Sequence, residues 1–187
     1  MIRTFISLDT PLFVKEELFL FQSELKKTNA DVRWEAKDKF HITLKFLGDV
    51  EETKIDSINE IIKKIVANIP SFEISLSDIG CFPNWNEPRV LWIGGEESSG
   101  ALHRLYKHIE NDFYAIGFDK EKRKFFPHIT LGRVKGHSGI SHLLQTMKSL
   151  TFSPQKFVCQ DLQLMKSELR FEGSLYSCLQ TFPFSSL

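Results

Sequence analysis

The sequence has 187 residues, 42% of them hydrophobic, so it is long and apolar enough to bury a core and it is not a disordered chain. Its 24 basic and 24 acidic residues cancel, which argues against a protein that wraps long nucleic acid but allows a pocket for one charged end. Cys81, Cys159 and Cys178 form no CxxC pair, and no apolar run approaches membrane-spanning length. We therefore expect a soluble cytoplasmic protein whose cysteines are buried and reduced.

The first predicted elements are a strand at residues 5–9 and a helix that runs to about Lys27. Thr10 is suited to cap this helix and Pro11 to its first turn, since a threonine oxygen can accept a free backbone N–H and proline has no N–H to leave unpaired. A stripe of four apolar residues is expected to face the core: Leu12, Leu18, Phe21 and Leu25.

The rest of the chain alternates irregularly between strands and helices. Strands are predicted at residues 32–34, 40–47, 72–76, 90–93, 125–131, 157–165 and 174–182, the last reached through a turn at Glu172-Gly173. Helices are predicted at residues 53–69, from Ser98 or Ser99, and at 140–150, with loops at 78–88 and 117–124. Because helices do not regularly connect successive strands, the order favours an α+β fold with antiparallel sheets over a doubly wound parallel sheet.

One tetrapeptide, His-Ile-Thr-Leu, occurs twice, at residues 41–44 and 128–131. Side chains alternate along a strand, so each copy places its histidine and threonine on one face and its isoleucine and leucine on the other. Two such strands facing each other would bring two imidazoles and two hydroxyls into one wet cleft. The sequence therefore predicts the active site there, and it hints at an internal duplication.

The residue types of this cleft suit phosphodiester chemistry. Histidine titrates near neutral pH, so the pair His41 and His128 can hold one protonated and one neutral ring and act as acid and base. Thr43 and Thr130 add hydroxyl donors for phosphate oxygens. Arg133, at the exit of the second strand, can form a bidentate pair with phosphate.

Other interpretations compete with this one. A zinc site usually adds Asp, Glu or Cys ligands at fixed spacing, and neither motif strand contains one, so no metal is predicted. Phe46 is expected to pack in the core. Phe82 and Trp85 could stack on a base or cap the core. The basic run at residues 120–124 is interpreted as a solvated loop rather than as a guide for RNA.

The ordered set of motifs resembles the two-histidine phosphoesterase superfamily, and within it the RNA 2′,3′-cyclic phosphodiesterases, formerly called 2′-5′ RNA ligases. The resemblance spans nearly the whole chain. It rests on Arg3–Leu8, Asp31–Trp34, His41–Gly48, Cys81–Pro83, Pro88–Trp92, Pro127–Arg133 and Met165–Leu169.

The resemblance implies one bilobal phosphoesterase domain over residues 1–187, an α+β fold with two mainly antiparallel sheets facing a central cleft and helices outside. It implies hydrolysis of an RNA 2′,3′-cyclic phosphate to a 2′-phosphomonoester without metal or cofactor, and the reverse 2′-5′ ligation. By position, His41 would be the proton donor to the departing 3′ oxygen and His128 the acceptor that activates water. Thr43, Thr130 and Arg133 would hold the phosphate.

Two alternatives stay open at this point. A related two-histidine phosphodiesterase could act on ADP-ribose cyclic phosphate or on 2′-5′ oligonucleotides with the same pocket chemistry. A non-catalytic module could instead bind RNA ends without turnover. The expected partner is an RNA 3′ end with a cyclic phosphate or a related nucleotide, bound by a monomer.

Overall fold

The computed structural model describes residues 1–170 and 173–185. Its strands are β1 (Ile2–Asp9), β2 (Val32–Trp34), β3 (His41–Val50), β4 (Phe72–Phe82), β5 (Val90–Glu96), β6 (His128–Val134), β7 (Gln155–Cys159), β8 (Asp161–Arg170) and β9 (Gly173–Pro183). Its α-helices are α1 (Leu12–Lys26), α2 (Ile55–Val66), α3 (Ala101–Ala115) and α4 (Ile140–Ser149). The α+β class and the order of elements agree with the sequence prediction, apart from one additional strand. The turn predicted at residues 172–173 lies partly outside the described residues.

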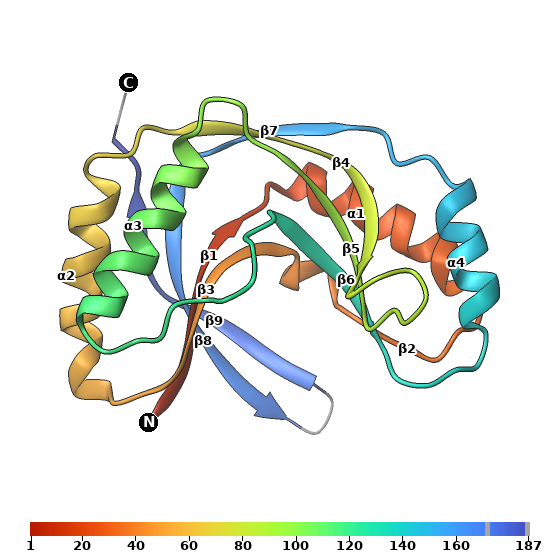
Figure 1. The fold of residues 1–187 in the computed structure, drawn as a ribbon, viewed down its shortest axis with the longest axis horizontal. Coiled ribbons are helices and arrows are strands. Elements are labelled where there is room, and N and C mark those ends of the chain that lie inside the picture. Colours follow the sequence, from red (N-terminus) through yellow and green to blue (C-terminus); the bar gives the residue numbers. More distant parts are fainter. Residues whose placement is uncertain (171–172, 186–187) are drawn as a thin grey trace.

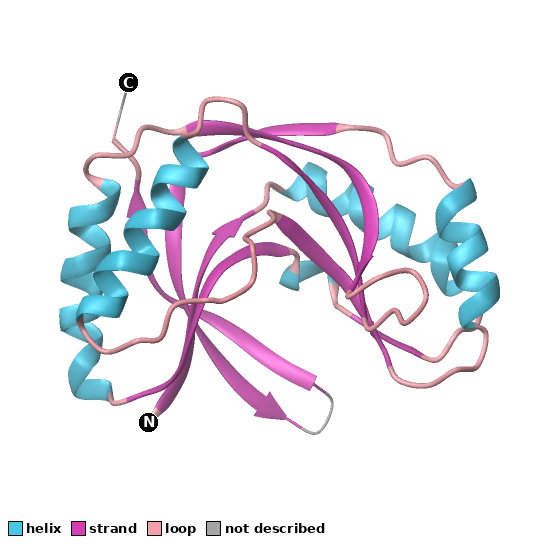
Figure 2. Cartoon of the chain, viewed as in Figure 1, coloured by secondary structure: helices cyan, strands magenta, loops and turns pink. Residues whose placement is uncertain are grey.

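The described strands form one curled sheet in the order β7-β4-β5-β6-β3-β1-β8-β9, with β2 paired to β6. Helices α2 and α3 cover one end of the molecule, and α1 and α4 cover the other (Figure 1). The same view coloured by secondary structure shows the strands running between these two helical pairs (Figure 2). We call β1, β3, β8 and β9 the first wing, and the remaining strands the second wing.

The expectation of two separate sheets is wrong, because the two wings share one ladder. They join where β3 pairs antiparallel with β6 through a single residue pair, Ile42 and Ile129. Both isoleucines are fully buried in the core. A join of one residue pair lets the motif strands meet and then diverge, so the sheet is continuous and yet has two wings.

The additional strand arises because the predicted strand 157–165 is two strands. β7 ends at Cys159 and pairs with β4 of the second wing, whereas β8 begins at Asp161 and pairs with β1 of the first wing. The chain thus changes wing at Gln160 while the apolar pattern continues. β4 is also longer than predicted, since it pairs with β5 as far as Phe82 opposite Val90.

The start of α1 differs from the prediction in two ways. Thr10 does not cap the helix; its hydroxyl donates to the carbonyl of Phe40 at 2.8 Å and so ties this segment to the residue before the first motif. Leu12 is 65% exposed, and the buried face of α1 includes Val14 and Gln22 instead. Gln22 lies in the core because its side-chain amide donates to the carbonyls of Glu35 and Leu131, at 2.8 Å each.

Cys81 and Cys159 are buried as expected, but Cys178 is exposed on β9. None of the helices in residues 1–170 and 173–185 has the length and apolar character needed to span a membrane.

A buried ion pair links the first wing to α3. The Lys45 ammonium lies 2.7 Å from a Glu110 carboxylate oxygen, and both side chains are less than a tenth exposed. Lys45 also donates to the carbonyl of Asp119, and Glu110 accepts the backbone N–H of Glu121, each at 2.8 Å. One pair therefore holds both α3 and the loop that leads into the second motif strand.

Glu110→Gln tests this link. It removes the negative charge at nearly constant size, so Lys45 stays buried without a counter-charge, and we expect a loss of about 3 to 5 kcal/mol in the free energy of unfolding by urea denaturation. Glu24→Gln breaks an exposed pair with Lys27 and should change the same quantity by less than about 1 kcal/mol. Equal stability of Glu110→Gln and the unaltered protein would contradict the role given to this pair.

Candidate active site

The two tetrapeptides lie on the strands that join the wings. Ile42 and Leu44 in β3, and their counterparts in β6, are buried, while the histidines and threonines lie on the other, partly exposed face. The predicted alternation is confirmed in both strands. Since Ile42 stands opposite Ile129 in an antiparallel pair, His41 and Thr130 lie one step to one side of it, and Thr43 and His128 one step to the other.

Each imidazole is oriented by a backbone carbonyl two residues earlier. His41 Nδ1 lies 2.7 Å from the carbonyl of Lys39, and His128 Nδ1 lies 2.8 Å from the carbonyl of Phe126. A carbonyl can only accept, so Nδ1 carries the proton of each neutral ring. Nε2 is thereby left available for chemistry in both rings. The His41 Nε2 atom lies 3.0 Å from the Thr43 hydroxyl.

Aromatic rings pack around both histidines. Phe5 stacks on His41 with 5.0 Å between ring centroids, and Tyr176 meets the same ring edge to face at 5.6 Å. Phe82 meets His128 edge to face at 4.9 Å. This contact places Phe82 beside the second histidine. Trp85 packs partly buried against the core, with Lys148 over its ring.

These surroundings change the protonation of both rings. Burial lowers the pKa of His41 to about 4, although its bond to Lys39 and the charge of Asp9 oppose the shift. Burial also lowers the pKa of His128, and the positive charge of Arg133 acts in the same direction. Both imidazoles are therefore neutral at pH 7 in the free protein.

All five residues singled out in the sequence line one small cavity between the wings. Its volume is about 30 Å³, and the described residues that line it are Glu35, Lys39, His41, Thr43, Phe46, His128, Thr130, Arg133 and Tyr176. Sequence reasoning missed Glu35, Lys39 and Tyr176, which come from segments with no motif. Within residues 1–170 and 173–185, no group of three or more His, Cys, Asp or Glu side chains could hold a metal ion.

The position of Phe46 corrects the expectation that it packs in the core. It is 65% exposed and lines the cavity. The reason is an irregularity in the β1–β3 ladder, where the register shifts between Ile6 and Ser7. Because of this shift Leu44 and Lys45 are both buried, and the next residue turns to the histidine face.

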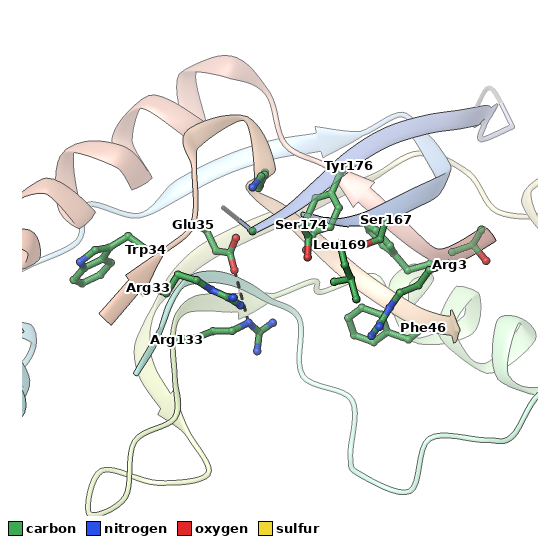
Figure 3. A pocket seen from close by; sticks show the side chains of 14 residues that line it. Arg3, Arg33, Trp34, Glu35, Phe46, Arg133, Ser167, Leu169, Ser174 and Tyr176 are labelled. Carbon is green, nitrogen blue, oxygen red and sulfur yellow. Dashed lines mark ion pairs between the residues drawn. The ribbon is translucent and has the colours of Figure 1, made fainter. Parts of the chain in front are cut away.

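Arg133 and Glu35 form the polar side of the cavity. The Arg133 Nε atom lies 3.7 Å from a Glu35 carboxylate oxygen, and Figure 3 shows this pair with the guanidinium directed into the open space. Because this separation exceeds hydrogen-bond range, the guanidinium keeps donors for an anion. The Arg133 side chain is 43% exposed, so an anion can reach it.

The comparisons with known proteins agree with this geometry. A family described as LigT like Phosphoesterase matches the chain twice, over residues 9–92 and 93–176, and each match contains one tetrapeptide. The RNA 2′,3′-cyclic phosphodiesterase of Thermotoga maritima is 33% identical over 182 residues, 97% of this chain and 95% of its own length. That of Methanocaldococcus jannaschii is 33% identical over 181 residues, 95% and 98% of the two chains.

A solved structure has the same fold. The crystal structure of E. coli LigT complexed with 3′-AMP aligns with a TM-score of 0.78 at 23% identity and covers 98% of each chain. The two successive family matches support the internal duplication suggested by the repeated tetrapeptide.

The low pKa of His41 can be tested by a ¹H–¹⁵N NMR titration of the imidazoles. We expect a neutral His41 ring with its proton on Nδ1 down to about pH 5, because its pKa is about 4. Between pH 6.5 and pH 4 the unfolded chain takes up a proton at this residue that the folded chain does not, so acid destabilises the fold in that window.

A pair of variants tests the cause of this shift. Tyr176→Ala uncovers one side of the His41 ring and should raise its pKa towards the usual value. Tyr114→Ala removes an exposed ring on α3 and should leave the pKa of His41 unchanged. A Tyr176→Ala protein with an unchanged His41 pKa would contradict the attribution to burial.

Proposed function

The chain belongs to the family of LigT-like phosphoesterases, and we infer that it hydrolyses RNA 2′,3′-cyclic phosphodiester ends to 2′-phosphomonoesters. The observation that carries the inference is the pairing of two imidazoles across one cavity, each with Nδ1 bound to a backbone carbonyl and Nε2 available. Two relatives that align over nearly their whole length are RNA 2′,3′-cyclic phosphodiesterases, which supports the same activity here.

The reaction needs one base and one acid on opposite sides of the phosphorus. His128 Nε2 accepts a proton from water as the water oxygen attacks. The bond from phosphorus to the 3′ oxygen breaks, and His41 Nε2 donates its proton to that oxygen. One proton enters the pair and one leaves it, so the product carries a 2′-phosphate and a 3′-hydroxyl. The donor and acceptor assignment follows the family resemblance.

The negative charge of the bound substrate allows His41 to become protonated and so to act as the acid. His41 is neutral in the free protein at pH 7 because burial lowers its pKa to about 4. A phosphodiester anion in the cavity favours the protonated ring and raises this pKa, since opposite charges attract strongly where water is excluded. Binding of the substrate thus promotes protonation of His41, the proposed acid.

Three residues hold the phosphate oxygens in this proposal. Thr43 and Thr130 donate hydroxyl hydrogen bonds from the same face as the imidazoles, and the Arg133 guanidinium stabilises the negative charge that grows in the transition state. One chain supplies all of these groups, so we propose that the protein acts as a monomer. When the 5′-hydroxyl of a second RNA end takes the place of water, the same groups form a 2′-5′ phosphodiester as the bond from phosphorus to the 3′ oxygen breaks.

Substitution of either histidine tests the activity. His41→Ala and His128→Ala should each lower kcat about a hundredfold to ten-thousandfold on an RNA oligonucleotide with a 2′,3′-cyclic phosphate, while circular dichroism shows an intact fold. His103→Ala removes an exposed imidazole on α3 and should be fully active.

The product, identified by ³¹P NMR, should be the 2′-phosphate in the presence of chelator. Full activity in either histidine variant would contradict the mechanism. If the unaltered protein binds this RNA without turnover, an RNA-end-binding module is favoured instead. A substrate panel separates RNA ends from ADP-ribose cyclic phosphate and 2′-5′ oligonucleotides.

The pH profiles of kcat/KM and kcat test whether substrate binding promotes protonation of His41. The reactive pair carries one proton, and burial lowers the pKa of both rings in the free protein. We therefore expect kcat/KM, which reports the free enzyme, to peak below pH 6.5 and to fall as pH rises. The profile of kcat, which reports the complex, should lie at higher pH because the bound anion raises the pKa of the acid. Coincident pH profiles of kcat and kcat/KM would show that the bound substrate does not raise the pKa of the acid.

A further inference from the structure

A second, larger cavity opens beside the catalytic one. Its volume is about 410 Å³, which is within the range of about 300 to 1,000 Å³ typical of small-molecule sites. The two cavities share five lining residues, Glu35, Lys39, Phe46, Arg133 and Tyr176. A substrate held at the histidines therefore continues directly into this space, which Figure 3 shows from close by.

The lining of the larger cavity is strongly cationic although the chain has no net charge. Four of its described lining residues are basic, Arg3, Arg33, Lys39 and Arg133, and one is acidic, Glu35. A concave surface lined by one sign of charge focuses its field on the space within. This charge favours an anionic ligand over a neutral or cationic one.

The arrangement of two of these arginines points to a specific group. Arg33 stands directly opposite Arg133 in the antiparallel pairing of β2 with β6. Like charges at opposed positions of a sheet destabilise it, and the one carboxylate among the described lining residues, that of Glu35, lies beside Arg133. Figure 3 shows the two guanidiniums next to each other on the same side of the cavity. Anionic groups bound at these two guanidiniums would relieve the repulsion.

The other walls fit a polynucleotide. The β8–β9 hairpin contributes the hydroxyls of Ser167 and Ser174 and the ring of Tyr176, and Phe46 lies across from them (Figure 3). Hydroxyls suit sugar and phosphate oxygens, and the exposed ring of Phe46 offers a face on which a base can stack. Arg3 lies near Phe46, but it stands opposite Asp49 in the β1–β3 ladder, so its charge has a potential partner.

We propose that Arg33 binds the phosphodiester that precedes the reacting nucleotide, so that the protein selects RNA of two or more nucleotides over a cyclic mononucleotide. The proposal rests on the proposed function, in which Arg133 holds the reacting phosphate. The next anionic group of an RNA strand is the phosphodiester on the 5′ side of the terminal nucleotide. The guanidinium opposite Arg133 is placed to receive it.

The experiment compares a cyclic-phosphate trinucleotide with the 2′,3′-cyclic mononucleotide as substrates. For the unaltered protein kcat/KM should be higher on the trinucleotide. Arg33→Gln should lower the ratio of the two kcat/KM values about tenfold, the effect of one charge-assisted hydrogen bond. Arg104→Gln, which removes an exposed arginine on α3 outside both cavities, should leave the ratio and the activity unchanged.

A modified substrate locates the contact. A trinucleotide with an uncharged methylphosphonate at the linkage before the reacting nucleotide should lose the same factor with the unaltered protein, and Arg33→Gln should add no further loss. The salt dependence of kcat/KM should also become shallower in Arg33→Gln, by about 0.7 in the log–log slope for one phosphate contact on a single strand. Removing the opposed charge should leave the melting temperature no lower.

Three results would overturn the proposal. Equal kcat/KM for both substrates in the unaltered protein would leave the proposed function intact but show that the preceding phosphodiester is not bound. An equal loss on both substrates in Arg33→Gln would place this arginine at the reacting phosphate or in the fold. Hydrolysis of neither substrate by the unaltered protein would remove the proposed function, and this proposal with it.

Discussion

The antiparallel pairing of Ile42 with Ile129 is the contact on which the site depends. These two residues are fully buried and form the sole register pair between β3 and β6, the strands that join the wings. With both isoleucines facing the core, the flanking histidines and threonines must face the opposite side. The antiparallel pair then places His41 and Thr130 on one side of the isoleucines and Thr43 and His128 on the other. Because the strands pair at one position only, they diverge on either side of it and leave space for a phosphate.

Orientation and burial prepare the imidazoles before substrate arrives. The carbonyls of Lys39 and Phe126 fix the proton on Nδ1, so the opposite nitrogen of each ring is the one that can react. The aromatic rings around them exclude water, which strengthens every charge interaction in the cavity. The same burial disfavours the charged imidazole and lowers the pKa of both histidines. In the proposed mechanism a bound anion offsets that penalty, so His41 becomes protonated when the substrate binds.

Buried polar residues hold the segments that carry the site. Thr10 ties the entrance of α1 to the residue before β3, and Gln22 joins the carbonyls of Glu35 and Leu131. The Lys45–Glu110 pair fixes the loop before β6 from the other side. Each of these side chains pairs with a backbone or charged group far along the chain, which local sequence patterns do not encode. Arg33 and Arg133 meet for a similar reason, because β2 pairs with a strand about a hundred residues away.

The sequence by itself determined the α+β class, the element order apart from one strand, and five residues that line the small cavity, four of them in the repeated tetrapeptide and the fifth Arg133. It could do so because alternation along a strand is local and because the tetrapeptide is repeated. Only the tertiary structure decided the rest. It joined the wings into one sheet, divided residues 157–165 between them, turned Phe46 outward through a shift in register and brought Tyr176 against His41. These features follow from which strands pair and in what register, and pairing between distant strands is set by the packing of the whole core.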